Sequence, residues 1–134
     1  MEIDIILRKI DLPKITTLSR VKYIYDSAHH GFAMSGDDQF LCVAGTRDDY
    51  VAIVNREDES YTLLQGLGEK PYWVTTDETG EYCYVAWCAT DQLSIISYAE
   101  KREVARIDVG DHPQRVRDGF VPAGWGQRRL TEEL

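Results

Sequence analysis

Residues 42 positions apart in this sequence match in type over two successive segments, and the alignment needs no gap. The first segment begins at His29 and the second at Pro71. The matched positions of the first segment are Phe40, Val43, Ala44, Asp49, Val51, Ile53, Val54, Leu67 and Gly68, which align with Tyr82, Val85, Ala86, Asp91, Leu93, Ile95, Ile96, Val109 and Gly110. A fixed period of this size indicates a chain built from stacked units of one structure.

The second segment predicts four short strands separated by turns. Its strongest strand is 81–87, which is rich in aromatic residues. The turn before it contains Gly80, which can adopt a positive φ. The stretch 103–109 alternates apolar and polar side chains, as expected for a half-exposed outer strand. The two remaining strands are predicted at 71–76 and 93–98.

The first segment follows the same plan, with strands predicted at 31–35, 39–44, 50–55 and 60–67. Four antiparallel strands in about 42 residues are typical of a β-propeller blade. A small sandwich or an open antiparallel sheet is the alternative, but such folds do not normally repeat at a fixed spacing. The predicted fold class is therefore all-β: a partial β-propeller with two complete four-stranded antiparallel blades and partial blades at each end.

The repeat divides the chain into five parts. Residues 29–70 and 71–112 are predicted to be complete blades. Residues 1–28 are predicted to be the outer strands of a partial blade, with 3–12 as its third strand and 21–25 at the end of its fourth. The first strand of a further blade is expected at 113–120, and a loosely held tail at 121–134.

The second segment resembles a known repeat family. Tyr84-Val85-Ala86-Trp87, Leu93-Ser94-Ile95-Ile96 and the ending 104–113 are similar to the second strand, third strand and Val-Gly-x-x-Pro-like ending of the YVTN-type β-propeller repeat (YncE-like). The resemblance covers roughly residues 20–120 and implies the fold more specifically than a function. Members of the family include surface proteins, lactonase-like enzymes and the haem-bearing propeller of nitrite reductases. Ala86-Trp87 and Ala44-Gly45 replace the family's Thr-Asn pair, so any polar role of that pair is lost here.

The number of blades predicts a partner. Closed propellers have roughly four to eight blades, and two isolated blades would expose two blade faces and a strand edge. The chain is therefore expected to be a fragment of a longer propeller or to assemble with copies of itself. Of these two explanations, a fragment of a longer propeller requires fewer assumptions.

Composition and charge narrow the classes of function. Hydrophobic residues make up 43% of the chain, as expected for a folded domain. The net charge of −8 repels phosphate backbones and anionic lipids, so neither nucleic-acid nor membrane binding is expected. The N-terminus carries acids where a signal peptide has bases, and no apolar run is long enough to span a bilayer. We therefore expect a cytoplasmic protein.

The sequence contains three cysteines, an odd number in a chain with no recognisable export signal. We therefore expect reduced thiols that fill the core or its rim. Cys83 and Cys88 lie on one predicted strand, which separates them by about 16 Å if it is extended. They cannot form a disulfide with each other or share a metal ion.

Loops between blades and loops between second and third strands share one end of known propellers, where binding residues concentrate. This end would collect all three histidines of the chain together with charged residues. The candidate binding residues are His29, His30, Arg47, Asp48, Asp49, Lys70, Asp91, His112 and Arg115.

These residues have a functional and a structural interpretation. In the first, the histidines bind a metal or haem, or one histidine acts as a general acid or base with Asp48 or Asp49. No ligand spacing supports a metal site, and adjacent residues such as His29 and His30 point to opposite sides of an extended backbone. In the second, the histidines are solvated while Asp49 and Asp91 are turn residues that cap neighbouring backbone amides. We expect no metal, no cofactor and no catalytic residues.

Two functions remain open. The first is a non-catalytic propeller module that binds a protein or small-molecule ligand through its loop face. The second is part of a propeller enzyme or cofactor-binding protein, lactonase-like or haem-propeller-like, with a histidine site at the channel mouth. The first is the prediction, and enzymatic activity is the less expected outcome.

Overall fold

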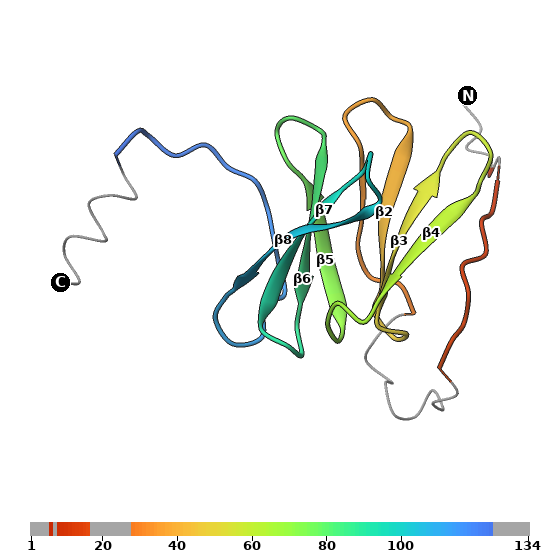
Figure 1. The fold of residues 1–134 in the computed structure, drawn as a ribbon, viewed down its shortest axis with the longest axis horizontal. Coiled ribbons are helices and arrows are strands. Elements are labelled where there is room, and N and C mark those ends of the chain that lie inside the picture. Colours follow the sequence, from red (N-terminus) through yellow and green to blue (C-terminus); the bar gives the residue numbers. More distant parts are fainter. Residues whose placement is uncertain (1–5, 7, 17–27, 125–134) are drawn as a thin grey trace, which may run out of the picture.

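The computed structural model describes residues 6, 8–16 and 28–124. It contains two four-stranded antiparallel sheets, ordered β1-β2-β3-β4 and β5-β6-β7-β8 (Figure 1). The strands are β1 (Phe32–Met34), β2 (Phe40–Gly45), β3 (Tyr50–Asn55), β4 (Tyr61–Gln65), β5 (Pro71–Thr76), β6 (Tyr82–Trp87), β7 (Gln92–Ser97) and β8 (Arg102–Asp108). The eight predicted strands are confirmed, and their ends differ from the prediction by no more than two residues. We call the sheet β1–β4 blade 1 and the sheet β5–β8 blade 2.

Outside these sheets, the residues that the structure describes form no further helix or strand. Among the described residues, 8–16 and 113–120 form no strand. The partial blades expected at the two ends therefore stay a prediction, and the segment 21–25 lies outside the described residues. The described part of the chain has no helix that is long and apolar enough to cross a membrane.

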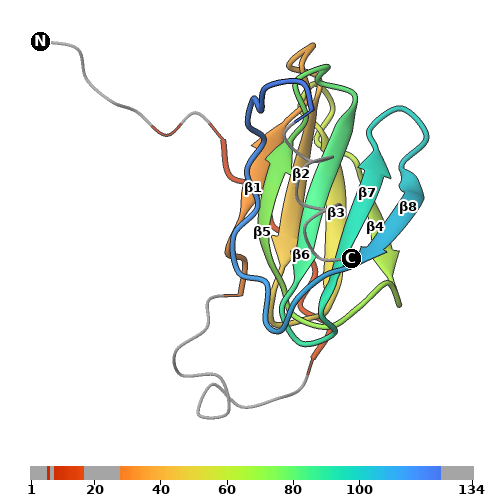
Figure 2. The same ribbon diagram turned by 90° about the vertical axis from the view of Figure 1, so that its left-hand side faces the viewer.

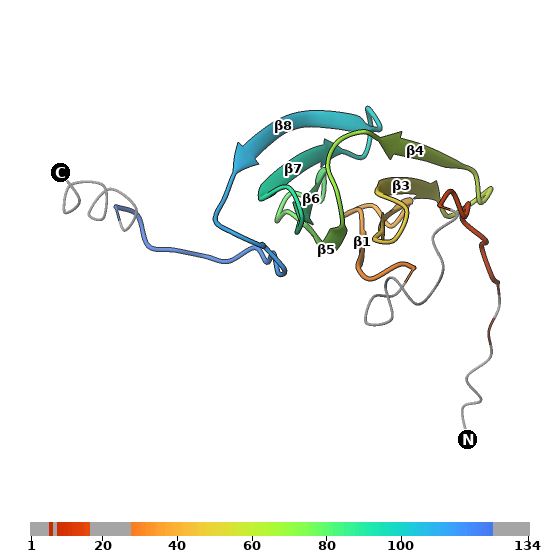
Figure 3. The same ribbon diagram turned by 90° about the horizontal axis from the view of Figure 1, so that it is seen from below.

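The two blades pack face to face, with β1 and β5 side by side at one edge (Figures 2 and 3). Alternate residues of each strand point to opposite faces, so each blade sends one set of apolar side chains toward the other. Buried members of this shared core are Cys42, Ala44, Val51 and Ile53 from blade 1, and Val74, Cys83, Val85, Trp87, Ile96 and Tyr98 from blade 2. The main core thus lies between the blades.

A disulfide joins Cys42 on β2 to Cys83 on β6, with a Cα–Cα distance of 6.5 Å. The expectation of reduced thiols is therefore wrong for these two residues, whereas Cys88 keeps its thiol. The repeat explains the pairing: the cysteines are 41 residues apart, one less than the period. Because side chains alternate, this offset places them on opposite faces of equivalent strands, and those faces meet between the blades.

The other face of blade 1 carries a second apolar cluster, formed by Tyr50, Ala52 and Val54. Ile10 and Leu12 pack against it. Residues 8–16 therefore run along the outer side of blade 1, as the red segment beside β4 in Figure 1 shows.

Candidate binding surface

The nine candidate residues lie at one end of the blades, which we call the loop end. It consists of the segments 28–31, 46–49, 66–70, 88–91 and 110–115. Backbone hydrogen bonds join them: the Arg47 amide donates to the Ala28 carbonyl at 3.4 Å, and the Cys88 amide donates to the Lys70 carbonyl at 3.0 Å. The Cys88 thiol also donates to the Pro113 carbonyl at 2.9 Å. The opposite end carries the turns that follow β1, β3, β5 and β7.

Asp49 and Asp91 have equivalent structural contacts in the two blades. The Asp49 carboxylate accepts a hydrogen bond from the Lys70 amide at 2.7 Å, and the Asp91 carboxylate accepts one from the His112 amide at 2.9 Å. In both pairs the bond spans 21 residues. Asp49 and Asp91 also have positive φ angles of 53° and 58°, which Asp tolerates in turns. Both carboxylates thus cap backbone amides, but these belong to the chain that leaves the blade, 21 residues away, and not to the neighbouring residues of the turn.

Asp48 is a buried carboxylate that holds the N-terminal segment. Its side chain is 1% exposed. One oxygen accepts hydrogen bonds from the amides of Ile15 and Thr16 at 3.2 and 2.5 Å, and the other pairs with Arg47 at 3.1 Å. A buried charge needs such partners. Asp48 therefore anchors residues 8–16 at the loop end.

His29 and Tyr50 form a hydrogen bond of 2.8 Å between the imidazole Nε2 and the phenol oxygen. Burial raises the pKa of Tyr50 to about 12, so the phenol keeps its proton. Its hydroxyl donates to the Pro13 carbonyl at 3.2 Å, which leaves its oxygen to accept from His29. Burial lowers the pKa of His29, an effect opposed by the Asp48 carboxylate and reinforced by Arg47. The lowered pKa favours neutral His29, with its proton on Nε2 to donate to the Tyr50 oxygen.

His30 and Arg115 meet aromatic side chains of β5 instead. The His30 ring stacks on Tyr72 with ring centres 3.7 Å apart and planes inclined by 25°. It also lies 6.0 Å from the Trp73 ring. The Arg115 guanidinium lies over Trp73 at 5.2 Å and that of Arg117 at 5.7 Å, within range of cation–π attraction. We call these five residues the stacked cluster.

The three histidines do not share a site. His29 contacts Tyr50, His30 stacks on Tyr72, and His112 is placed by its backbone contact with Asp91. Within the described ranges, no group of three His, Cys, Asp or Glu side chains is arranged to hold a metal ion. The candidate residues therefore divide into structural carboxylates, a His29–Tyr50 pair and the stacked cluster.

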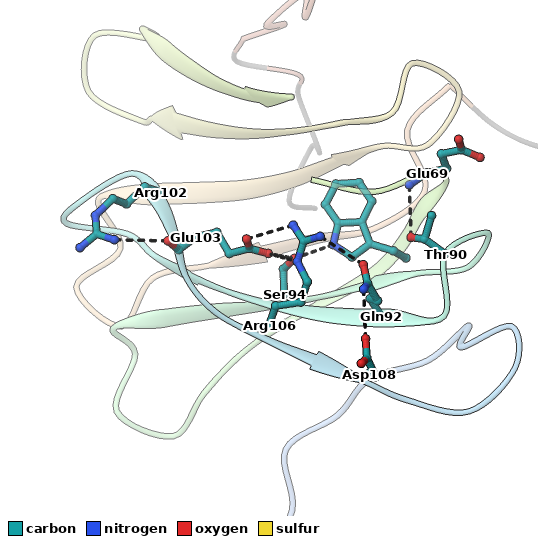
Figure 4. A network of polar contacts seen from close by, with 9 residues as sticks. Glu69, Thr90, Gln92, Ser94, Arg102, Glu103, Arg106 and Asp108 are labelled. Carbon is teal, nitrogen blue, oxygen red and sulfur yellow. Dashed lines mark hydrogen bonds and ion pairs between the residues drawn. The ribbon is translucent and has the colours of Figure 1, made fainter. Parts of the chain in front are cut away.

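Sequence reasoning missed a polar network inside blade 2 (Figure 4). The buried Trp87 indole donates to the Ser94 hydroxyl at 2.7 Å, and this hydroxyl donates to the Glu103 carboxylate at 2.5 Å. Arg106 binds both oxygens of Glu103 at 2.9 and 3.0 Å. The network continues from Arg106 to Gln92 and Asp108 (Figure 4).

The repeat contains a signal for this network. The positions in blade 1 that align with Trp87, Ser94 and Arg106 are Gly45, Ala52 and Leu64, so the polar set is a departure from the repeat. In blade 1 the ring of Tyr50 covers the space that a Cβ on Gly45 would enter, at 2.5 Å. An aromatic ring thus fills the equivalent space in both blades. In blade 2 it is Trp87 of the second strand, and in blade 1 it is Tyr50 of the third strand.

Comparisons with known proteins identify the fold. No family model matches the sequence, and no curated protein matches it. The structure is similar to the hydrazine synthase of Kuenenia stuttgartiensis, with TM-score 0.57 and 22% identity over 63% of this chain and 24% of that chain. It is also similar to the periplasmic gluconolactonase PpgL of Pseudomonas aeruginosa, with TM-score 0.56 and 19% identity over 70% of this chain and 29% of that chain.

A third match is a chain of the mitotic checkpoint complex, with TM-score 0.51 and 19% identity over 83% of this chain and 36% of that chain. The three matched proteins are β-propellers. This chain spans only 24% to 36% of their length. At these identities the likeness establishes the fold alone, and the chain has the architecture of two consecutive β-propeller blades.

Proposed function

We propose that this chain is a YVTN-type propeller module that acts without catalysis, binding a partner through its loop end. The observation that carries the proposal is the stacked cluster, in which His30, Tyr72 and Trp73 lie together beneath Arg115 and Arg117. The structural neighbours include both enzymes and a WD40 scaffold, so they favour neither class of function.

The chemistry of the loop end favours a partner with acidic and flat apolar groups. Asp48, Asp49 and Asp91 bind backbone amides of the chain itself, so their carboxylates are occupied. Arg115 and Arg117 are exposed and hold their guanidinium groups over Trp73. A stacked guanidinium still presents N–H donors at its edge, which match a carboxylate. We therefore infer an acidic peptide segment of a protein partner as the ligand.

Fluorescence anisotropy with a labelled peptide of alternating Glu and Tyr tests this proposal. We expect the wild-type chain to bind this peptide and not a matched peptide of Lys and Tyr. Arg115→Gln and Trp73→Leu should each weaken binding about tenfold, because each removes one half of a cation–π pair and a ligand contact. Arg56→Gln is the matched control, since Arg56 is an exposed arginine at the opposite end of blade 1.

Three results would contradict the proposal. Equal binding of both peptides would mean nonspecific adhesion, and equal loss in the Arg56→Gln variant would mean that overall charge alone attracts the peptide. If a single-stranded oligonucleotide binds as tightly as the acidic peptide, the loop end does not select a protein partner. A metal or an absorbance band that copurifies with the chain, and is lost in His29→Gln, would instead support the propeller enzyme or cofactor protein.

A further inference from the structure

Each blade has two faces, and the contact between the blades uses one face of each. We call the face of a blade that is directed toward the following blade its front face, and the opposite one its back face. The front face of blade 1 packs against the back face of blade 2 in the shared core. Within the described residues, no blade covers the back face of blade 1 or the front face of blade 2.

The front face of blade 2 is apolar across three strands. Residues of β6 that alternate with Cys83 and Val85 point away from blade 1. The strand register continues this face from Tyr84 to Ile95 and Ala105. Its members are Tyr84, Ala86, Leu93, Ile95, Ala105 and Ile107. Ile107 is 48% exposed, so part of an apolar sheet face meets solvent.

The repeat relates the front face of blade 2 to the front face of blade 1, which packs against blade 2. Tyr84, Ala86, Leu93 and Ile95 align with Cys42, Ala44, Val51 and Ile53, the residues of blade 1 that are buried against blade 2. On the other side, Leu41, Val43, Ala52 and Val54 of the back face of blade 1 align with Cys83, Val85, Ser94 and Ile96. The two uncovered faces therefore correspond, position by position, to the two faces that already pack together.

Most substitutions between these two pairs of faces are compatible with docking, with the exception of Arg56 at the position of Tyr98. At the site of the disulfide, Tyr84 replaces Cys42 and Leu41 replaces Cys83. At the position where the disulfide joins the two blades of one chain, Tyr84 of one copy would meet Leu41 of the next in an apolar contact. Ala52 replaces Ser94, so the back face of blade 1 lacks the hydroxyl of the polar network in blade 2.

Residues 8–16 fill the back face of blade 1 incompletely. Ile10 and Leu12 contact it, yet a cavity of about 360 Å³ remains between them and the sheet. The cavity is lined by Ile10, Leu12, His29, Phe32, Leu41, Val43 and Val54. Phe32 at this site is 73% exposed. This face therefore has room for a partner that covers more of it.

We propose that the front face of blade 2 docks onto the back face of blade 1 of a second copy, displacing Ile10 and Leu12 from it. The contact is head-to-tail, so each copy uses two different faces and copies related by rotation close into a ring. Because closed propellers have roughly four to eight blades, about two to four copies complete one ring. Burial of apolar surface drives the docking.

Light scattering on a sizing column tests the proposal with two one-sided variants of the full chain. Ile95→Glu/Ile107→Glu blocks the front face of blade 2, and Phe32→Glu/Leu41→Glu blocks the back face of blade 1. We expect a discrete oligomer for the wild type and a monomer for each variant alone. An equimolar mixture should form a heterodimer, a twofold increase in mass, because one intact front face meets one intact back face. The blocked faces carry like charges and repel each other.

Each alternative result overturns the proposal. A monomeric wild type would mean that copies of this chain do not cover the two faces, and further blades of a longer chain would then be the alternative. A mixture that stays monomeric would exclude head-to-tail docking, and variants that assemble alone would mean that other surfaces associate. Circular dichroism checks that each variant keeps its β-sheet signal. These results are independent of peptide binding at the loop end, so either proposal can fail alone.

Removal of the competing segment provides a second measurement. Ile10→Ser/Leu12→Ser weakens the hold of residues 8–16 on the back face of blade 1. We expect the oligomer of this variant to dissociate at a severalfold lower concentration than that of the wild type. The same variant should lose the ability to associate when it also carries Ile95→Glu/Ile107→Glu. An unchanged dissociation concentration would contradict displacement of the segment.

Discussion

Cys42 and Cys83 form a disulfide across the interface between two blades, one residue short of the period that relates those blades. The offset by one residue turns two side chains on equivalent strands toward each other. The bond closes a long loop and links the middle of one sheet to the middle of the next. The blade interface thus has a covalent contact within its apolar core.

The disulfide should contribute strongly to stability. In the chain-entropy model, closing a loop of 41 residues stabilises the folded state by about 4 kcal/mol. We expect reductant to lower the free energy of unfolding of the wild type by about this amount. Cys42→Ser should unfold equally easily with and without reductant. Urea unfolding followed by circular dichroism measures both.

Cys88→Ser is the matched control, because Cys88 is buried and lies outside the disulfide. This variant should keep the response to reductant. Alkylation of the denatured, unreduced wild type should modify only Cys88 of the three cysteines. Modification of all three would mean that the disulfide does not form.

Gly80 should tolerate no side chain, because its turn touches the backbone of blade 1. A Cβ on Gly80 would lie 2.4 Å from the Gly36 Cα, and the Gly36 amide donates to the Gly80 carbonyl at 2.9 Å. Gly80 has φ +77° and Gly66 has φ +70°, but a Cβ on Gly66 meets no atom within 4 Å. Both Ala substitutions share the strain of positive φ, so their difference isolates the clash.

We expect Gly80→Ala to lower the free energy of unfolding by about 1–3 kcal/mol more than Gly66→Ala does. Urea unfolding of the two variants side by side measures this difference. Equal losses would mean that the turns of the two blades are not in contact.

Ser94→Ala should destabilise blade 2 although it changes only one atom. The Ser94 hydroxyl accepts from the Trp87 indole and donates to Glu103, and its removal leaves both groups without this partner. Such a loss costs about 1–3 kcal/mol for a buried group. Thermal unfolding should show a lower midpoint than in Ser60→Ala, where the hydroxyl is exposed. A midpoint equal to that of the control would mean that the network makes no net contribution to stability.

The His29–Tyr50 pair predicts that stability falls in mild acid. The pKa of His29 is lowered in the folded state, so between that value and the ordinary value near 6.5 the unfolded chain binds more protons. The free energy of unfolding therefore falls as the pH decreases through this window and levels off below it. Urea midpoints at pH values above and below the window measure this change.

His29→Gln should remove this part of the pH dependence, because its amide does not titrate. His112→Gln is the matched control: it removes an exposed histidine and should keep the wild-type difference between the two pH values. If His29→Gln responds to pH as the wild type does, proton uptake by His29 does not account for the loss.

The local parts of this fold are readable from the chain because they depend on neighbours in sequence. The eight strands and the turns between them follow from alternation of apolar residues and from the repeat of 42 residues. The order and direction of the strands in a blade also predict that the candidate residues lie at one end. These features need no knowledge of how one blade meets the other.

Contacts across the blades depended on the tertiary structure. The spacing of Cys83 and Cys88 excludes a disulfide between these two, but it says nothing of Cys42, the partner of Cys83 in the other blade. The stacking of His30 on Tyr72 and the approach of Gly36 to Gly80 likewise join segments whose separation the packing of two sheets decides. Strand alternation specifies which way a side chain points, and only the packing of the sheets specifies what it meets.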